Sequence, residues 1–230
     1  MKSGRRWTIV SYVSIAIIVA FLASAVRFLG AIGELPMVAL PEVFWRVVFK
    51  NTIILGVIAI LMRLEGDGFA GLALSRKRLG RQMLFGVILG PVMLIFGQVL
   101  VTPIVSAVVP GPSPVTITAW FQDLSYIPLW AVLIVYGGGL GEELTRVFVL
   151  TRFEKRWGRP GLALAILAHA TAFGMAHLYQ GIQVAIGLGI SAVVYSLIFA
   201  RRRSAIEMIT AHITFDAIGV TLGFFMFYNS

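Results

Sequence analysis

The sequence predicts an all-α fold, a polytopic transmembrane helix bundle, and three observations support this prediction. First, 59% of the 230 residues are hydrophobic and only 13% are charged. Second, apolar runs of about 20 residues recur along the chain, and an α-helix of this length crosses a hydrocarbon core of about 30 Å. Third, the basic residues gather in short clusters between these runs, as they do beside the cytoplasmic ends of membrane helices.

We expect about seven spans, at residues 8–29, 43–63, 82–108, 127–150, 160–179, 183–200 and 205–227. With the N-terminus in the cytoplasm, only Arg27, Arg46, Lys50 and Arg146 of the 19 basic residues fall outside the cytoplasmic segments. This bias predicts that the N-terminus lies inside and the C-terminus outside. Because no repeat or second domain is visible, residues 1–230 are expected to form a single integral membrane domain.

The first span also has a second interpretation. Basic residues, an apolar run and the sequence Ala23-Ser24-Ala25 are together typical of a signal peptide with its cleavage site. A transmembrane helix is favoured, because the apolar run continues past this sequence. In the third span, Pro91 and Pro103 are expected to kink the helix or to end it early. The net charge of +9 is explained by orientation in the lipid bilayer, so no nucleic-acid partner is expected.

Two carboxylates and a guanidinium interrupt the fourth apolar run, at Glu142, Glu143 and Arg146. Ionisable groups are costly at membrane depth, so they indicate a functional site by default. On a helix the two glutamates point about 100° apart and are expected to do different jobs. Arg146 lies within reach of either glutamate. A structural ion pair explains one Glu–Arg pair equally well, but the second carboxylate then needs another partner.

All three histidines lie in the last apolar runs. His169 and His177 belong to the fifth span, whereas His212 and Asp216 lie four residues apart on one face of the seventh. A lone membrane histidine is more often a hydrogen-bonding residue between helices than a catalyst. Three histidines together with three acids and an arginine point instead to a metal site or to a hydrolytic site that activates a water.

The order of these groups resembles a known family. The matching stretches are Glu142-Glu143 followed by Arg146, then Phe173-Gly174-Met175-Ala176-His177, then His212-Ile213-Thr214-Phe215-Asp216. They resemble the motifs Glu-Glu-x-x-x-Arg, Phe-x-x-x-His and His-x-x-x-Asn or Asp of the CPBP family. This family contains the CAAX-processing and bacteriocin-processing intramembrane proteases, is also called the Abi family, and is related to the Rce-type prenyl-protein endopeptidases. The resemblance covers about residues 66–227, with the motifs in 141–216.

The resemblance implies peptide-bond hydrolysis in a membrane cavity open to the cytoplasm. Glu142, assisted by His177, would activate a water as general base. His212 would stabilise the tetrahedral oxyanion, and Asp216 would orient its imidazole. The expected location is an inner (cytoplasmic) bacterial membrane.

The first motif departs from the family pattern, because Arg146 comes one residue early. Aligned on the glutamate pair, Glu142 is the catalytic carboxylate and Glu143 holds Arg146, and we favour this alignment. Aligned on Arg146, Gly141 replaces the first glutamate. The family has also been described as metalloproteases, in which case Glu142, His177 and His212 would form a zinc (Zn²⁺) set with an open fourth position.

Depth in the membrane separates the two histidines of the fifth span. Glu142 and His212 lie at similar depths, about 15 Å and 13 Å from the nearest cytoplasmic arginine clusters. His177 lies about 25 Å from the start of its span, whereas His169, at about 13 Å, fits the common depth better. The motif favours His177 and the depth favours His169. We choose His177 as the site residue and keep His169 in reserve.

The predicted function is an intramembrane endopeptidase that acts near the C-terminus of a membrane-associated peptide or protein, prenylated or not. Two alternatives stay open. One is a non-catalytic adaptor or immunity protein of the same fold, which the altered first motif favours. The other is a proton-coupled transporter, in which the buried ionisable groups would form a relay.

Overall fold

The computed structural model describes residues 39–110 and 118–228, and every regular element in these ranges is a helix. The expected first span, residues 8–29, lies outside them. Five of the described helices are long and apolar enough to cross a membrane: Leu40–Glu65, Leu79–Val108, Leu124–Ala176, Ile182–Arg202 and Ala205–Phe227. The all-α membrane fold is therefore confirmed, whereas seven spans and their orientation stay predictions.

Three helices follow their predicted spans to within a few residues. They are α2 (Leu40–Glu65), α8 (Ile182–Arg202) and α9 (Ala205–Phe227). α2 ends at Gly66, whose φ of 73° is a left-handed conformation that closes a helix readily. α9 begins at the N-cap Ser204, whose hydroxyl accepts a hydrogen bond from the backbone N–H of Glu207 at 3.1 Å. Local capping thus defines where these apolar runs start and stop.

The third predicted span continues past both of its prolines. α3 (Leu79–Ile95) contains Pro91, the π-helical turn η2 (Phe96–Val101) follows, and α4 (Thr102–Val108) carries Pro103 in its first turn. A proline removes one backbone N–H donor and crowds the preceding turn. The wider π-helical turn lies directly before Pro103, where it gives that turn more room. The helix is therefore modified at this proline and does not end there.

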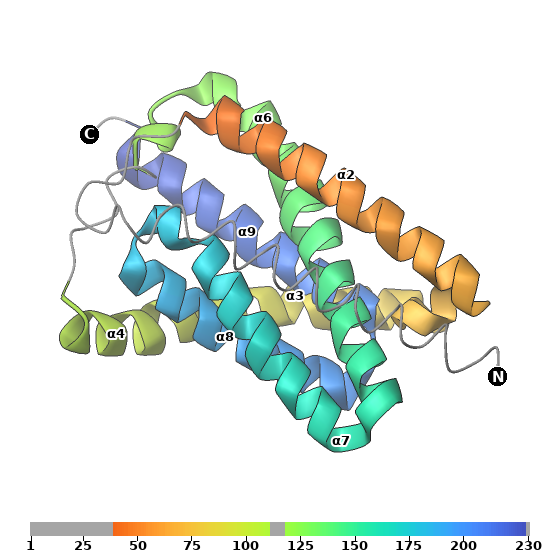
Figure 1. Cartoon of the computed structure of the whole chain (residues 1–230). Helices are drawn as coiled ribbons and strands as arrows, with labels where there is room; N and C mark the ends of the chain where they lie inside the picture. Colours follow the sequence, from red (N-terminus) through yellow and green to blue (C-terminus); the bar gives the residue numbers. More distant parts are fainter. Residues whose placement is uncertain (1–38, 111–117, 229–230) are drawn as a thin grey trace.

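The fourth and fifth predicted spans are two helical arms between which the chain reverses direction. The arms are built from η4 (Leu124–Tyr126), α6 (Ile127–Val132), the π-helical segment η5 (Leu133–Glu142) and α7 (Glu143–Ala176). Gly158 breaks α7 with φ 64° and ψ −151°, a backbone conformation that favours glycine. Figure 1 shows the resulting reversal, with the turn at the lower tip of the molecule.

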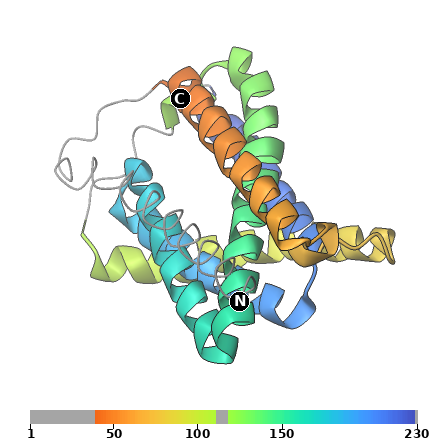
Figure 2. The ribbon, with the colours of Figure 1, turned by 45° about the vertical axis from the view of Figure 1, so that its right-hand side comes forward.

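The helices pack in pairs, α3 against α9 and α7 against α8, and the two views in Figures 1 and 2 show the bundle that results. Gly86 and Gly90 lie one turn apart on α3 and face α9. A Cβ at Gly86 would come within 2.6 Å of the Thr210 Cβ, and a Cβ at Gly90 within 2.7 Å of the Ala211 carbonyl oxygen. Small residues at this spacing let membrane helices approach closely.

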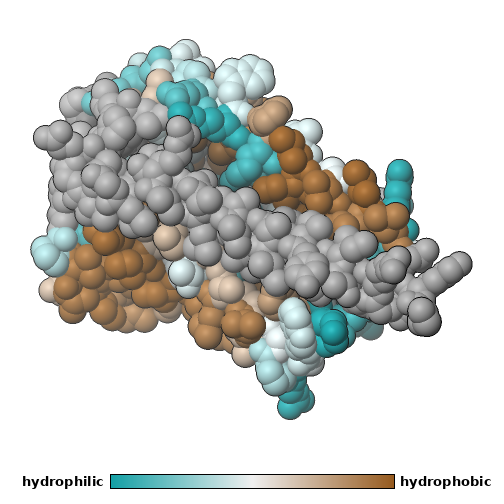
Figure 3. Space-filling model, in the orientation of Figure 1, coloured by the Kyte–Doolittle hydropathy of each residue, from teal (hydrophilic) through white to brown (hydrophobic). Residues whose placement is uncertain are grey.

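The outer surface of the bundle carries large apolar side chains. Phe225 is 83% exposed, Val99 71% and Phe49 70%. On the face shown in Figure 3, apolar atoms cover the lower left and the upper right, and hydrophilic atoms lie at the lower tip, along the upper part and at the right edge. This distribution suits a lipid environment, because exposed apolar patches of this extent are unusual on monomeric water-soluble proteins.

Candidate active site

Glu143 and Arg146 form a buried ion pair in the first turn of α7. Nη1 of Arg146 donates to both carboxylate oxygens, at 2.6 and 2.7 Å, and neither side chain is more than 1% exposed. The guanidinium also lies 5.5 Å from the ring centroid of Phe173 and 5.3 Å from that of Tyr195. Both charges of this pair are therefore held by several neighbours. Helical spacing left Arg146 within reach of either glutamate, and the favoured alignment assigned it to Glu143, where the structure places it.

His212 of α9 is the second partner of Glu143. Its Nδ1 lies 2.6 Å from Oε1 of Glu143, and because a carboxylate oxygen only accepts, Nδ1–H donates. The other nitrogen, Nε2, lies 3.5 Å from Oδ2 of Asp216 and 3.7 Å from Oε2 of Glu142. Asp216 was expected to orient this imidazole, but Glu143 makes the closer contact. The one-turn spacing of His212 and Asp216 does bring them together, as predicted.

Glu142 ends the π-helical segment η5 and lines a cavity. Its side chain is 13% exposed, compared with 0% for Glu143. It interacts electrostatically with His177, His212 and Lys50, and its 3.7 Å contact with His212 is longer than a hydrogen bond. The two adjacent glutamates thus have different surroundings, as the helical spacing predicted.

His177 and His169 have different positions relative to this cavity. His177 follows the last residue of α7 and lines the cavity, with Nδ1 2.8 Å from the carbonyl oxygen of Phe173. A carbonyl only accepts, so Nδ1–H donates and Nε2 of the neutral ring keeps a lone pair. His169 is buried beside the Phe173 ring, at 6.1 Å between centroids. Its Nδ1 has no hydrogen-bond partner within the described part of the chain.

The cavity has a volume of about 240 Å³. Its polar lining includes Glu142, His177, His212 and Asp216, and its apolar walls come mostly from aromatic and aliphatic side chains: Val43, Val47, Trp120, Phe121, Trp130, Leu133, Ile134, Phe173, Leu188, Phe215 and Val220. Gly138 lies against the polar groups, because a Cβ there would come within 2.6 Å of Oδ2 of Asp216 and 3.0 Å of Nε2 of His212. Only glycine leaves this side of the site open.

α2 supplies two further residues that sequence reasoning missed as parts of the site. Asn51, 1% exposed, donates from Nδ2 to the carbonyl oxygen of Gly137 at 3.1 Å. Any Cβ at Gly141 would collide with this same amide, so α2 is held directly beside the turn that carries Glu142. Lys50, which the charge pattern assigned to the outer side, interacts electrostatically with Glu142 and His177. The available signal was the polar triplet Lys50-Asn51-Thr52 inside the second apolar run.

The structure does not bring Glu142, His177 and His212 together as a zinc-binding group. Across the ranges that the structure describes, no three His, Cys, Asp or Glu side chains form a group that could hold a metal ion. The residues as placed therefore do not fit a zinc site made of Glu142, His177 and His212, nor one that uses His169.

Comparison with known proteins identifies the part of the chain that contains these groups. A family model described as Type II CAAX prenyl endopeptidase Rce1-like matches residues 124–218. This range contains all the residues predicted for catalysis, namely Glu142, Glu143, Arg146, His177, His212 and Asp216, whereas α2 lies outside it. A search of curated proteins and a search of solved structures each found no match. The resemblance predicted from the motifs is confirmed over the matched residues.

Proposed function

We propose that this chain, whose residues 124–218 match the Rce1-like CAAX endopeptidases, is an intramembrane endopeptidase. One observation carries the proposal. Glu142 of η5, His177 at the end of α7, and His212 and Asp216 of α9 line one cavity. A water occupies about 30 Å³, so a cavity of about 240 Å³ has room for a water together with part of a peptide chain. A carboxylate and imidazoles around a water are the groups that activate water for hydrolysis.

In this proposal Glu142 is the general base. Its carboxylate takes a proton from a water, and the water oxygen attacks the carbonyl carbon of the scissile peptide bond. His177 assists from across the cavity, because its Nδ1–H is engaged by Phe173 and its Nε2 lone pair is left to accept a hydrogen bond from the same water. The proton held by Glu142 then passes to the leaving amine as the C–N bond breaks.

His212 stabilises the oxyanion that forms in the first step. Its Nδ1–H is held by Glu143, and with Glu142 and Asp216 beside Nε2 an imidazolium at His212 would have three carboxylate neighbours. The imidazolium donates from Nε2 to the oxyanion in a site that excludes most water. Glu143 thereby takes the orienting role that the family pattern suggested for Asp216. Asp216 stabilises the positive charge from the cavity side.

The test is peptide cleavage by purified protein in detergent, comparing wild type with Glu142→Gln. Loss of the general base is expected to lower kcat about 10²- to 10⁴-fold, with an unchanged melting temperature. Glu154→Gln is the matched control, because Glu154 pairs with Arg203 and neither residue lines the cavity. Wild-type rates in Glu142→Gln would exclude this mechanism. Because no zinc set is assembled, cleavage is also expected to persist with a chelator present.

The two alternatives predict different results in the same assay. A non-catalytic adaptor would show no cleavage by folded wild-type protein with any peptide. A proton-coupled transporter would instead acidify or alkalinise sealed proteoliposomes when its cargo is added, and Glu142→Gln would abolish that signal. A substrate cut near its C-terminus, prenylated or not, and a bacterial cytoplasmic membrane are the finer parts of the proposal that the family resemblance supports.

A further inference from the structure

The charged groups of the bundle are concentrated at one end. We call residues 63–81, 152–159 and 201–204 the basic end, because in the described part of the chain they contain every Lys and Arg except Arg46, Lys50 and Arg146. The structure joins these segments. The backbone N–H of Ala205 donates to the Ala73 carbonyl at 3.1 Å, and Arg152 Nε lies 2.9 Å from Glu65 Oε2.

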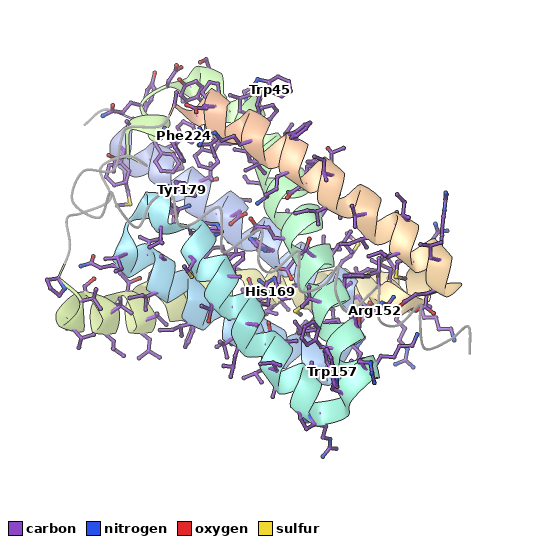
Figure 4. All side chains as sticks on the ribbon, viewed as in Figure 1. Trp45, Arg152, Trp157, His169, Tyr179 and Phe224 are labelled. Carbon is purple, nitrogen blue, oxygen red and sulfur yellow. The ribbon has the colours of Figure 1, made fainter. Side chains whose placement is uncertain are left out.

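The opposite end contains aromatic side chains and few charges. We call residues 39–47, 118–130, 177–183 and 219–228 the cavity end, and Arg46 is the one Lys or Arg in these ranges. The Phe121 ring stacks on Trp130 at 5.4 Å and meets Phe224 edge-on at 5.5 Å. Figure 4 shows Tyr179 and Phe224 toward one end of the bundle and Arg152 and Trp157 toward the other.

The cavity extends from the middle of the bundle to the cavity end. Its walls include Trp120, Phe121, Trp130, Tyr179 and Gln180, all of which belong to that end. Helix lengths agree with this placement. Counted along the helices from the basic end, the polar groups lie about 10 Å away at His212 on α9 and about 25 Å away at His177, directly after α7. The polar groups therefore extend from the middle of the bundle, at His212, to the aromatic rim, at His177.

From these two observations we infer that the active-site cavity faces the non-cytoplasmic side of the membrane. Loops rich in Lys and Arg stay in the cytoplasm, and the basic end is the end farthest from the cavity rim. The sequence-based expectations of a cytoplasmic basic end and of a cavity open to the cytoplasm do not fit together in this structure. The charge asymmetry decides between them, because it involves three separate loops.

This inference rests on the proposed endopeptidase function and narrows its substrate class. The scissile bond must reach the polar groups from the outer surface or from the outer leaflet. The substrates are therefore exported peptides, or membrane-anchored peptides whose cleavage site lies outside the cytoplasm. Trp and Tyr prefer the membrane–water interface, so Trp120, Trp130 and Tyr179 suit a rim at that depth. A protein prenylated at its C-terminus in the cytoplasm would meet the basic end instead.

Cysteine labelling tests the sidedness directly, because the chain contains no cysteine. Ser125→Cys at the cavity end and Ser75→Cys at the basic end are matched reporters, since both serines are exposed. In intact cells a membrane-impermeant maleimide is expected to label Ser125→Cys and not Ser75→Cys, and after permeabilisation it should label both. Labelling of Ser75→Cys in intact cells, or protection of Ser125→Cys there, overturns the inference. Gln122→Cys replaces Ser125→Cys if the latter does not react in detergent.

A second measurement separates sidedness from activity. An impermeant quenched peptide that wild-type protein cleaves in detergent is added to sealed membrane vesicles of either orientation. Cleavage is expected only in right-side-out vesicles, and cleavage confined to inverted vesicles overturns the inference while leaving the endopeptidase intact. If no peptide is cleaved in detergent, the proposed function fails, and the labelling result alone decides which side the cavity faces.

Discussion

The basic end and the cavity both bring acids and bases together, but at different distances. At the basic end Arg152 lies 2.9 Å from Glu65, Arg202 2.7 Å from Glu207 and Arg203 2.7 Å from Glu154. In the cavity the contacts that Glu142 and Asp216 make with His212 are longer, at 3.7 and 3.5 Å. Acids at the basic end are paired with guanidinium groups, whereas those in the cavity face an imidazole that can change its charge.

This difference separates structural from chemical carboxylates. A carboxylate bound by an arginine stays ionised and contributes to stability, whereas a less tightly held carboxylate near an imidazole is able to exchange protons. Glu143 belongs to the first kind, although it is adjacent to Glu142 in sequence and lies next to the cavity. The comparison therefore predicts that neighbouring residues respond differently to the same substitution.

The largest effect on stability is expected for Glu143→Gln. The change removes the carboxylate from Arg146 and His212, and an uncompensated buried charge costs about 3–5 kcal/mol. The melting temperature in detergent should fall steeply, and cleavage should be lost with it. Glu142→Gln is the control, because it alters the adjacent residue without leaving Arg146 unpaired. Equal melting temperatures for the two variants would show that Glu143 is not structural.

An intermediate effect on activity is expected where α2 meets the turn that carries Glu142. In Gly141→Ala the new methyl group would displace the Asn51 amide and shift the turn that carries Glu142. A catalytic group misplaced by about 1 Å lowers the rate about 100-fold, so kcat should fall by about that factor. Asn51→Ala should be milder and should relieve the collision. The double variant is therefore expected to match Asn51→Ala alone, and the measurement is a double-mutant cycle in kcat. Additive losses would contradict the proposed contact.

The smallest effect is expected at the basic end, for Glu154→Gln. Its ion pair with Arg203 is partly exposed, with side chains 26% and 45% accessible, and exposed pairs are worth about 0–1 kcal/mol. Melting temperature and kcat should both stay close to wild type. A loss comparable to that of Glu143→Gln would remove the distinction between the two ends of the molecule.

Much of this architecture is predictable from the sequence, because lipid imposes simple rules. Apolar runs of spanning length predicted the positions of α2, α8 and α9. Helical spacing predicted that Arg146 meets one of the two glutamates and that His212 and Asp216 share one helix face. These are local relationships. Pairing along one helix depends only on its periodicity, and the apolar length depends only on the bilayer.

The features that were missed depend on contacts between distant segments. The contact of Asn51 with the Gly137 carbonyl spans 86 residues, and no local pattern predicts it. The π-helical form of η5 (Leu133–Glu142) changes the direction in which Glu142 points. This segment contains no proline from which the sequence could predict the change. The depth argument favoured His169 because it placed the whole site at one level, whereas the cavity extends along the bundle to His177 at the end of α7.

The most direct test of the central claim compares His177→Ala with His169→Ala in one peptide-cleavage assay. Both histidines belong to the same helical arm, and only His177 lines the cavity. If this cavity is the active site, His177→Ala should lower kcat by about 100-fold or more, as for an acid–base residue, while His169→Ala keeps most of the wild-type rate. Loss of cleavage in His169→Ala with normal cleavage in His177→Ala would contradict the account.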